Sequence, residues 1–93
     1  MGISEAALGR AVLRTIKQRW PQAWVLGGRH SVAGVPDLIL CGPGGHFLAL
    51  ELKTPRGHVT PIQAATLEKI RRAGGVAEVV RSVEETRCLV TGL

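Results

Sequence analysis

The chain of 93 residues is long enough for one domain with a modest hydrophobic core, to which a second copy of the chain could add stability, and we expect residues 1–93 to form a single domain. Its 12 Lys and Arg residues outnumber its 7 Asp and Glu residues, and the formal net charge of +5 favours a polyanionic partner such as nucleic acid. No segment approaches the about 20 apolar residues of a membrane-spanning helix, and the N-terminus lacks the pattern of a secretory signal, so we expect a cytoplasmic protein with no membrane contact.

The first part of the chain predicts a helix followed by two strands. Ser4 is a suitable N-cap for a helix that runs to about residue 19, before Pro21. One face of this helix is apolar and another is basic; the apolar residues are Leu8, Ala11, Val12 and Ile16, and the basic ones are Arg10, Arg14 and Lys17. Residues 23–26 predict a short strand, residues 27–35 a glycine-broken loop, and residues 37–41 a second strand.

The second part predicts a hairpin, a crossover helix and a final strand. The turn "GPGG" at 42–45 joins the strand 37–41 to a third strand at 46–53 in antiparallel fashion. Thr60, Pro61 and Gln63 form the start of a helix with a capping box, and Gly74-Gly75 ends it; its apolar positions are Ile62, Leu67, Ile70 and Ala73. Residues 76–80 predict a strand parallel to 46–53, and Ser82 with Glu85 caps a short terminal helix.

These elements predict an α/β fold with a mixed sheet of about four strands. The order is helix, three strands, helix, strand and a short C-terminal helix. Helices on both faces of the sheet would explain why residues 37–41 are apolar on both sides.

Two other features bear on cofactors. Cys41 and Cys88 show neither metal-site spacing nor the density of a disulfide framework, so we expect both to be reduced and packed in the interior. The segment "GGRH" at 27–30 does not match the phosphate-binding pattern GxxxxGK[ST], and we expect no nucleotide cofactor.

Three charged residues lie on the two most apolar strands. Strand alternation places Glu51 and Lys53 on the same face, about 7 Å apart along the chain, and antiparallel pairing places Asp37 beside them. Two carboxylates with one ammonium suit a Mg²⁺ site for phosphate chemistry. The alternative is a simple ion pair at a strand end, which is common by chance for an ExK pair alone.

The same residues carry a resemblance to a known family. "PD" at 36–37 and "ELK" at 51–53, in this order of elements, resemble the PD-(D/E)xK nuclease superfamily, which implies a restriction-endonuclease-like core. Together with "VTPIQ" at 59–63 and "AGG" at 73–75, the chain is similar over nearly its whole length to the virus-type replication-repair nuclease family, VRR-NUC.

The resemblance implies roles for individual residues. Asp37 and Glu51 would bind Mg²⁺, with Mn²⁺ as a second option, the carbonyl of Leu52 would add a ligand, and Lys53 would be the catalytic lysine. An acidic residue on the first helix and a glutamine after ExK also belong to the pattern; Glu5 as a metal ligand and Gln63 as a catalytic residue fit these positions. Each has a structural alternative, because Glu5 also suits the helix dipole and Gln63 the capping box.

The chain resembles standalone, phage-type members, which look like dimeric Holliday-junction resolvases. We therefore expect a homodimeric, metal-dependent DNA endonuclease, selective for branched or duplex DNA, in replication, recombination or repair, located in the host cytoplasm if phage-encoded. The alternatives are a non-catalytic DNA-binding module and a nuclease subunit that needs a partner protein.

Basic residues would contact the DNA backbone. The candidates are Arg10, Arg14 and Lys17 on the first helix, and Arg29, His30, Arg56 and His58 in loops. Each of them alone is equally a solvated surface residue. Since no helix resembles a base-reading element, we expect recognition of DNA shape and backbone.

Overall fold

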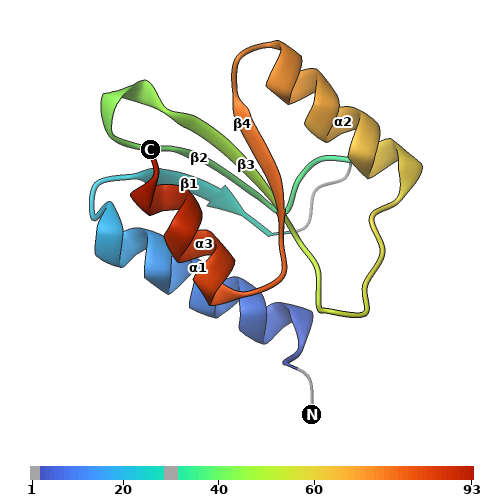
Figure 1. Cartoon of the computed structure of the whole chain (residues 1–93), viewed down its shortest axis with the longest axis horizontal. Coiled ribbons are helices and arrows are strands. Elements are labelled where there is room, and N and C mark those ends of the chain that lie inside the picture. Colours follow the sequence, from blue (N-terminus) through green and yellow to red (C-terminus); the bar gives the residue numbers. More distant parts are fainter. Residues whose placement is uncertain (1–2, 29–31) are drawn as a thin grey trace.

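The computed structural model of the chain describes residues 3–28 and 32–93. Its elements are α1 (Glu5–Arg19), β1 (Trp24–Gly27), β2 (Leu38–Cys41), a 3₁₀ turn η1 (Pro43–Gly45), β3 (Phe47–Leu52), α2 (Pro61–Arg72), β4 (Val76–Val80) and α3 (Val83–Thr91). This order confirms the predicted α/β fold, and Figure 1 shows the arrangement of the elements.

The helices begin where local side-chain hydrogen bonds satisfy their free main-chain N–H groups. The hydroxyl of Ser4 accepts from the N–H of Ala7, which confirms the cap of α1. In α2 the capping box is complete, because the Thr60 hydroxyl accepts from the Gln63 N–H and the Gln63 side chain accepts from the Thr60 N–H. The start positions of the helices are therefore local properties of the sequence.

The four strands form one mixed sheet in the order β1-β2-β3-β4. The antiparallel pairing of β2 with β3 and the parallel pairing of β3 with β4 are confirmed. β1, whose direction the sequence analysis left open, is antiparallel to β2. In this register Leu38 lies opposite Leu50, so the start of β2 lies beside the end of β3. The three charged residues belong to this end of the sheet.

Helices lie on both sides of the sheet. α1 and α3 lie together on one side, and α2 lies on the other (Figure 1). The main core lies under α1 and α3 and includes Leu48, Leu50 and Leu52, whereas Ala49 packs with Leu67 of α2 in a second cluster. The predicted alternation of β3 is confirmed, and it directs Glu51 to the side of α2.

The cover over β2 differs from the prediction. α2 packs mainly on β3 and β4, so Ile39 is only half-buried on that side and Cys41 is exposed. The expectation that helices cover both sides of residues 37–41 was therefore right for one side only. A single helix covers about two strands, since strands lie about 4.8 Å apart and a helix is about 10 Å wide.

Two further expectations about the interior were wrong. Cys41 and Cys88 are free thiols, but both are exposed. Ile62 and Ala73, predicted as inward positions of α2, are exposed as well, while Leu67 is buried and Ile70 half-buried. The contacts of α2 with the sheet are made by Leu67 and Ile70 in its second half, whereas Ile62 in its first turn is 53% exposed. Within the described residues, no helix is long and apolar enough to cross a lipid bilayer.

Candidate active site

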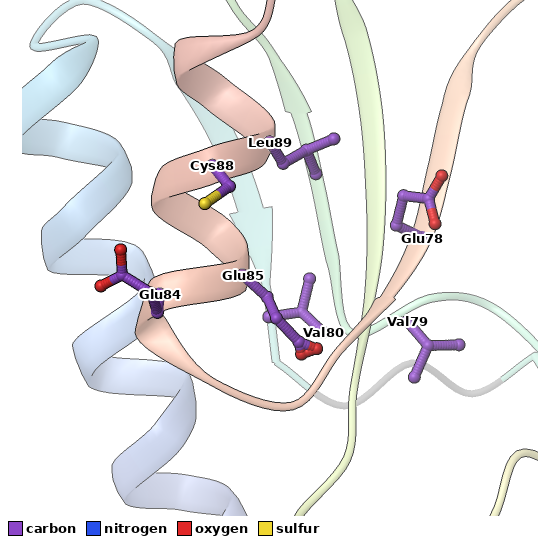
Figure 2. Close-up of a pocket in the computed structure, with 7 residues that line it drawn as sticks. All are labelled: Glu78, Val79, Val80, Glu84, Glu85, Cys88 and Leu89. Carbon is purple, nitrogen blue, oxygen red and sulfur yellow. The ribbon is translucent and has the colours of Figure 1, made fainter.

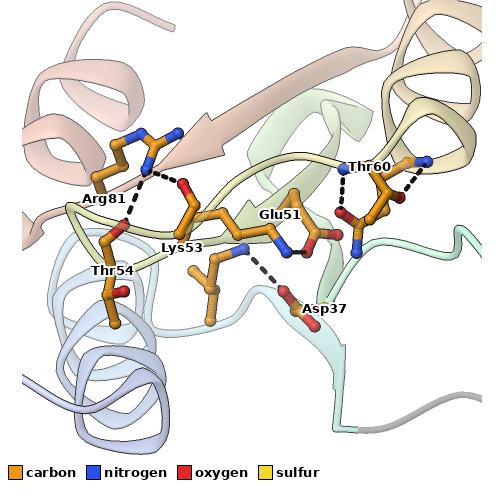
Figure 3. A network of polar contacts seen from close by, with 9 residues as sticks. Asp37, Glu51, Lys53, Thr54, Thr60 and Arg81 are labelled. Carbon is orange, nitrogen blue, oxygen red and sulfur yellow. Dashed lines mark hydrogen bonds and ion pairs between the residues drawn. The ribbon is translucent and has the colours of Figure 1, made fainter.

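Asp37, Glu51 and Lys53 meet at one end of the sheet, as the strand pairing predicted. The Lys53 ammonium Nζ lies 3.5 Å from Glu51 Oε2. Asp37 Oδ2 accepts a hydrogen bond of 2.8 Å from the main-chain N–H of Leu52, which fixes this carboxylate beside the end of β3. Figure 3 shows the three side chains converging from β2 and β3.

The Glu51 carboxyl group is in an unusual electrostatic environment. Its side chain is only 2% exposed, and burial is the main reason why its pKa rises from 4.5 to about 7. A hydrogen bond to Asp37 and repulsion by its negative charge raise the pKa further, while the nearby Lys53 lowers it. Near neutral pH, Glu51 is therefore partly protonated, unlike an ordinary glutamate.

This pKa argues against a simple ion pair of Glu51 and Lys53. A carboxylate stabilised mainly by a neighbouring ammonium has a lowered pKa, whereas that of Glu51 is raised. Two acidic groups share one lysine in a buried place, so the cluster has an excess of negative charge that a proton or a cation can neutralise. A carboxyl group with a pKa raised in this way is typical of binding and catalytic sites.

Arg81 supports the cluster from the neighbouring strand, a feature that the sequence reasoning missed. Its guanidinium Nη1 donates to the carbonyl oxygens of Thr54 and Gly57, both at 2.8 Å, and so holds the turn that follows Lys53 (Figure 3). The Lys53 N–H in turn donates to the carbonyl of Val80 at 3.0 Å. A signal was present in the sequence, because parallel pairing places the residue after β4 beside the residues after β3.

A cavity of about 780 Å³ opens beside Asp37 on the α1 side of the sheet. Glu5, Arg10 and Lys17 line it together with Asp37 and apolar side chains. Lys17 is also a structural residue, since its Nζ donates to the carbonyl of Ala23 at 2.7 Å. The structure thus brings Arg10 and Lys17 of α1 to the same cavity as Asp37, whereas Glu51 does not line it.

The remaining basic candidates are distributed differently. Arg14 is exposed on α1 outside this cavity, and Arg56 and His58 are exposed in the loop after Lys53. Arg29 and His30 lie outside the described residues. DNA contacts by any of these residues stay predictions.

The comparisons with known proteins agree with this geometry. Residues 4–84 match the VRR-NUC domain family. The chain belongs to this family. A solved structure named "VRR_NUC domain" is 25% identical, with 96% of this chain and 97% of that chain covered and a TM-score of 0.73. Another, a "VRR_NUC domain protein", is 21% identical with 99% and 88% covered and a TM-score of 0.77, which shows a common fold. The search of curated proteins gave no match.

VRR-NUC domains are nuclease domains, and three further residues were expected at the site of this one. Glu5 is exposed in the first turn of α1, which fits its role at the helix dipole, and it lines the same cavity as Asp37; its role as a metal ligand stays a prediction. Gln63 forms the capping box, which confirms its structural role. The N–H of Leu52 binds Asp37, while metal binding by its carbonyl stays a prediction.

The side chains present fit a Mg²⁺ ion in this VRR-NUC domain. Among residues 3–28 and 32–93, no three His, Cys, Asp or Glu side chains lie close enough together to enclose a metal. Mg²⁺ does not need such a cage, because it commonly binds one or two carboxylates and takes its other ligands from water and phosphate. Asp37 and the destabilised carboxylate of Glu51 form a pair of this kind.

A second hollow, between β4 and α3, contains three glutamates but does not resemble the site (Figure 2). Glu78 forms an ion pair with Arg71, Glu84 with Arg87, and Glu85 accepts from the N–H of Arg81. These carboxylates are exposed and each has a partner. The partners of these glutamates are therefore protein groups, and nothing in this hollow indicates a binding site.

Proposed function

We propose that this VRR-NUC domain is a Mg²⁺-dependent endodeoxyribonuclease that hydrolyses phosphodiester bonds, with Mn²⁺ as a possible substitute. The observation that carries the proposal is the pair of the buried Glu51 and the half-buried Asp37 beside Lys53, with the Glu51 pKa raised to about 7. Two acidic groups that share one lysine, one of them buried, do not favour the stability of the fold, but they suit a reaction at a phosphate.

The side chains divide the work of the reaction. Asp37 and Glu51 would hold the metal, with the carbonyl of Leu52 as a further ligand. Because the three carboxylates of Asp37, Glu51 and Glu5 do not form a cluster around one point, Glu5 would contribute through a water molecule. Bound there, Mg²⁺ supplies Lewis-acid polarisation of the scissile phosphate. Lys53 donates hydrogen bonds to the attacking water and offsets the negative charge that grows on the phosphate. Gln63 at the start of α2 contributes a side-chain amide for positioning the water.

The substrate is proposed to be branched or duplex DNA, cut by a homodimer as in a Holliday-junction resolvase, during replication, recombination or repair in the cytoplasm. The net charge of +5 supports a polyanionic substrate. Arg10, Arg14, Lys17 and, beyond Lys53, Arg56 and His58 would contact phosphates on both sides of the acidic cluster, and Arg29 and His30 are further candidates. Such contacts read the backbone and favour recognition by shape.

A cleavage assay tests the activity. A synthetic four-way junction, a flap and a plain duplex are incubated with the purified chain in EDTA, Mg²⁺ or Mn²⁺. We expect metal-dependent cleavage, with the junction cut fastest, and a loss of about 100-fold or more in Asp37→Asn, Glu51→Gln and Lys53→Ala. The matched controls Glu68→Gln and Lys69→Ala, on the exposed side of α2, retain full activity. Intact DNA in every metal refutes the proposal.

The same assay separates the alternatives. A non-catalytic DNA-binding module binds these DNAs in a salt-dependent way, cuts none of them, and is insensitive to Lys53→Ala. A subunit that needs a partner neither cuts nor binds by itself.

A metal titration tests the acidic pair without any DNA. Mg²⁺ at about 100 times its dissociation constant is expected to raise the free energy of unfolding by about 3 kcal/mol. The increase is lost in Asp37→Asn and kept in Glu68→Gln. An equal increase in both variants would place the ion elsewhere.

A further inference from the structure

Small residues keep open the cavity on the α1 side of the sheet. α1 lines it with Ala6 and Gly9, and β1 lines it with Gly27. A Cβ atom at Gly9 would lie 3.3 Å from Leu52 Cδ1, and one at Gly27 would lie 2.8 Å from Leu38 Cδ2. A larger residue at either glycine would therefore displace a leucine of the core. The volume of about 780 Å³ is within the range of about 300–1,000 Å³ for small-molecule sites.

The walls of this cavity combine apolar and positively charged side chains. Leu13 of α1 and Val25 of β1 are half-buried in it. Arg10 and Lys17 are exposed, and they are about 10 Å apart along α1 with Leu13 between them. An apolar surface between two cations complements a nucleotide, because a nucleotide joins a flat base to anionic phosphate.

We propose that this cavity holds one unpaired nucleotide of a DNA strand, with its base against Leu13 and Val25 and the adjoining phosphates at Arg10 and Lys17. The bases of a fully paired duplex are stacked and cannot enter a cavity, whereas a base that is already unpaired enters at the least cost. This role rests on the proposed function, since Asp37 lines the same cavity and the scissile phosphate would lie next to the bound nucleotide. The preferred substrate is then DNA with an unpaired nucleotide at its branch point.

Equilibrium binding in EDTA tests the cavity without cleavage. Fluorescence anisotropy compares three labelled DNAs: a nicked duplex with a one-nucleotide flap, the same DNA with an abasic flap nucleotide, and the fully paired nicked duplex. The abasic flap keeps the phosphate and lacks only the base. We define the base preference as the dissociation constant of the abasic flap divided by that of the normal flap. The expected base preference is about tenfold, and the paired duplex binds no better than the abasic flap.

Filling the cavity from its exposed side removes the base preference. Ala6→Leu introduces a larger side chain at an exposed position of α1 that lines the cavity, and leucine is a good helix former. We expect the base preference of this variant to fall below about twofold. Ala65→Leu is the matched control at an exposed position of α2, and it keeps the full preference. Arg10→Ala weakens the binding of both flaps by the same factor, since it removes a phosphate contact and leaves the base contact in place.

Two results overturn the nucleotide site: equal affinity for the normal and the abasic flap, or a base preference that survives in Ala6→Leu. If Ala6→Leu does not fold, the comparison of the two flaps in the unchanged protein still decides. A protein that binds none of the three DNAs refutes the nucleotide site and the DNA substrate together. Metal-dependent cleavage without a base preference refutes the nucleotide site alone, and a base preference without cleavage in any metal refutes the nuclease alone.

Discussion

Replacing Glu51 by glutamine changes the pH dependence of stability in a direction that the structure fixes. Glutamine has nearly the same shape and can keep a hydrogen bond to Asp37, but it cannot ionise. The variant therefore removes one titrating group and leaves the packing at the end of β3 in place.

The sign follows from the raised pKa. Between pH 4.5 and about 7 the folded protein keeps a proton on Glu51 that the unfolded chain has already released, so unfolding becomes easier as the pH rises. The stabilising contribution is complete below pH 4.5 and is lost as the pH passes through about 7. At 1.36 kcal/mol per pH unit, the loss amounts to about 3 kcal/mol.

Urea unfolding in EDTA at several pH values between about 4 and 8 measures this effect. The quantity of interest is the free energy of unfolding of Glu51→Gln minus that of the unchanged protein. Titrating groups distant from Glu51 contribute equally to both proteins and cancel in this difference, so what remains belongs to Glu51 and the two groups that contact it, Asp37 and Lys53. We expect the difference to increase by about 3 kcal/mol from the acid to the alkaline end of the range.

A flat difference, or one that falls with rising pH, would refute the reasoning about the acidic pair. Glu78→Gln serves as the control, because Glu78 is on the neighbouring strand but half exposed. Its difference is expected to stay within about 0.5 kcal/mol across the range, as for other surface substitutions.

Three other substitutions test how the site and its surroundings are supported. Arg81→Gln removes the guanidinium that holds the turn after Lys53. We expect the free energy of unfolding, measured with urea, to fall by about 2 kcal/mol and the cleavage rate to fall as well. If Arg81→Lys restores stability but not the rate, Arg81 positions Lys53; equal recovery of both means that it only stabilises. Thr60→Ala removes the cap of α2 and is expected to cost about 1 kcal/mol, readable as a lower urea midpoint; an unchanged midpoint contradicts the role of the cap. Gly42→Ala places a methyl group 2.7 Å from the Trp20 ring, so we expect a loss of about 1–3 kcal/mol and a shift in tryptophan fluorescence, whereas a neutral effect means that the ring moves freely.

The sequence by itself determined the elements and much of their order. Ser4, Thr60 and Ser82 cap helices through contacts within a few residues, and the alternation of β3 follows from the pleat of a strand. The hairpin turn fixes the pairing of β2 with β3. The position of Asp37 beside Glu51 could therefore be predicted from the sequence. These are local effects, and local effects can be read along the chain.

Only the tertiary structure decided what surrounds these residues. The raised pKa of Glu51 depends on burial by elements distant in the chain, and the support by Arg81 depends on a turn 24 to 27 residues earlier. The exposure of Cys41 was likewise not predictable from its apolar strand, because it depends on how far α2 extends across the sheet. Whether a side chain is buried depends on how the helices and the sheet pack together. The residue type alone does not tell how far a helix covers the sheet.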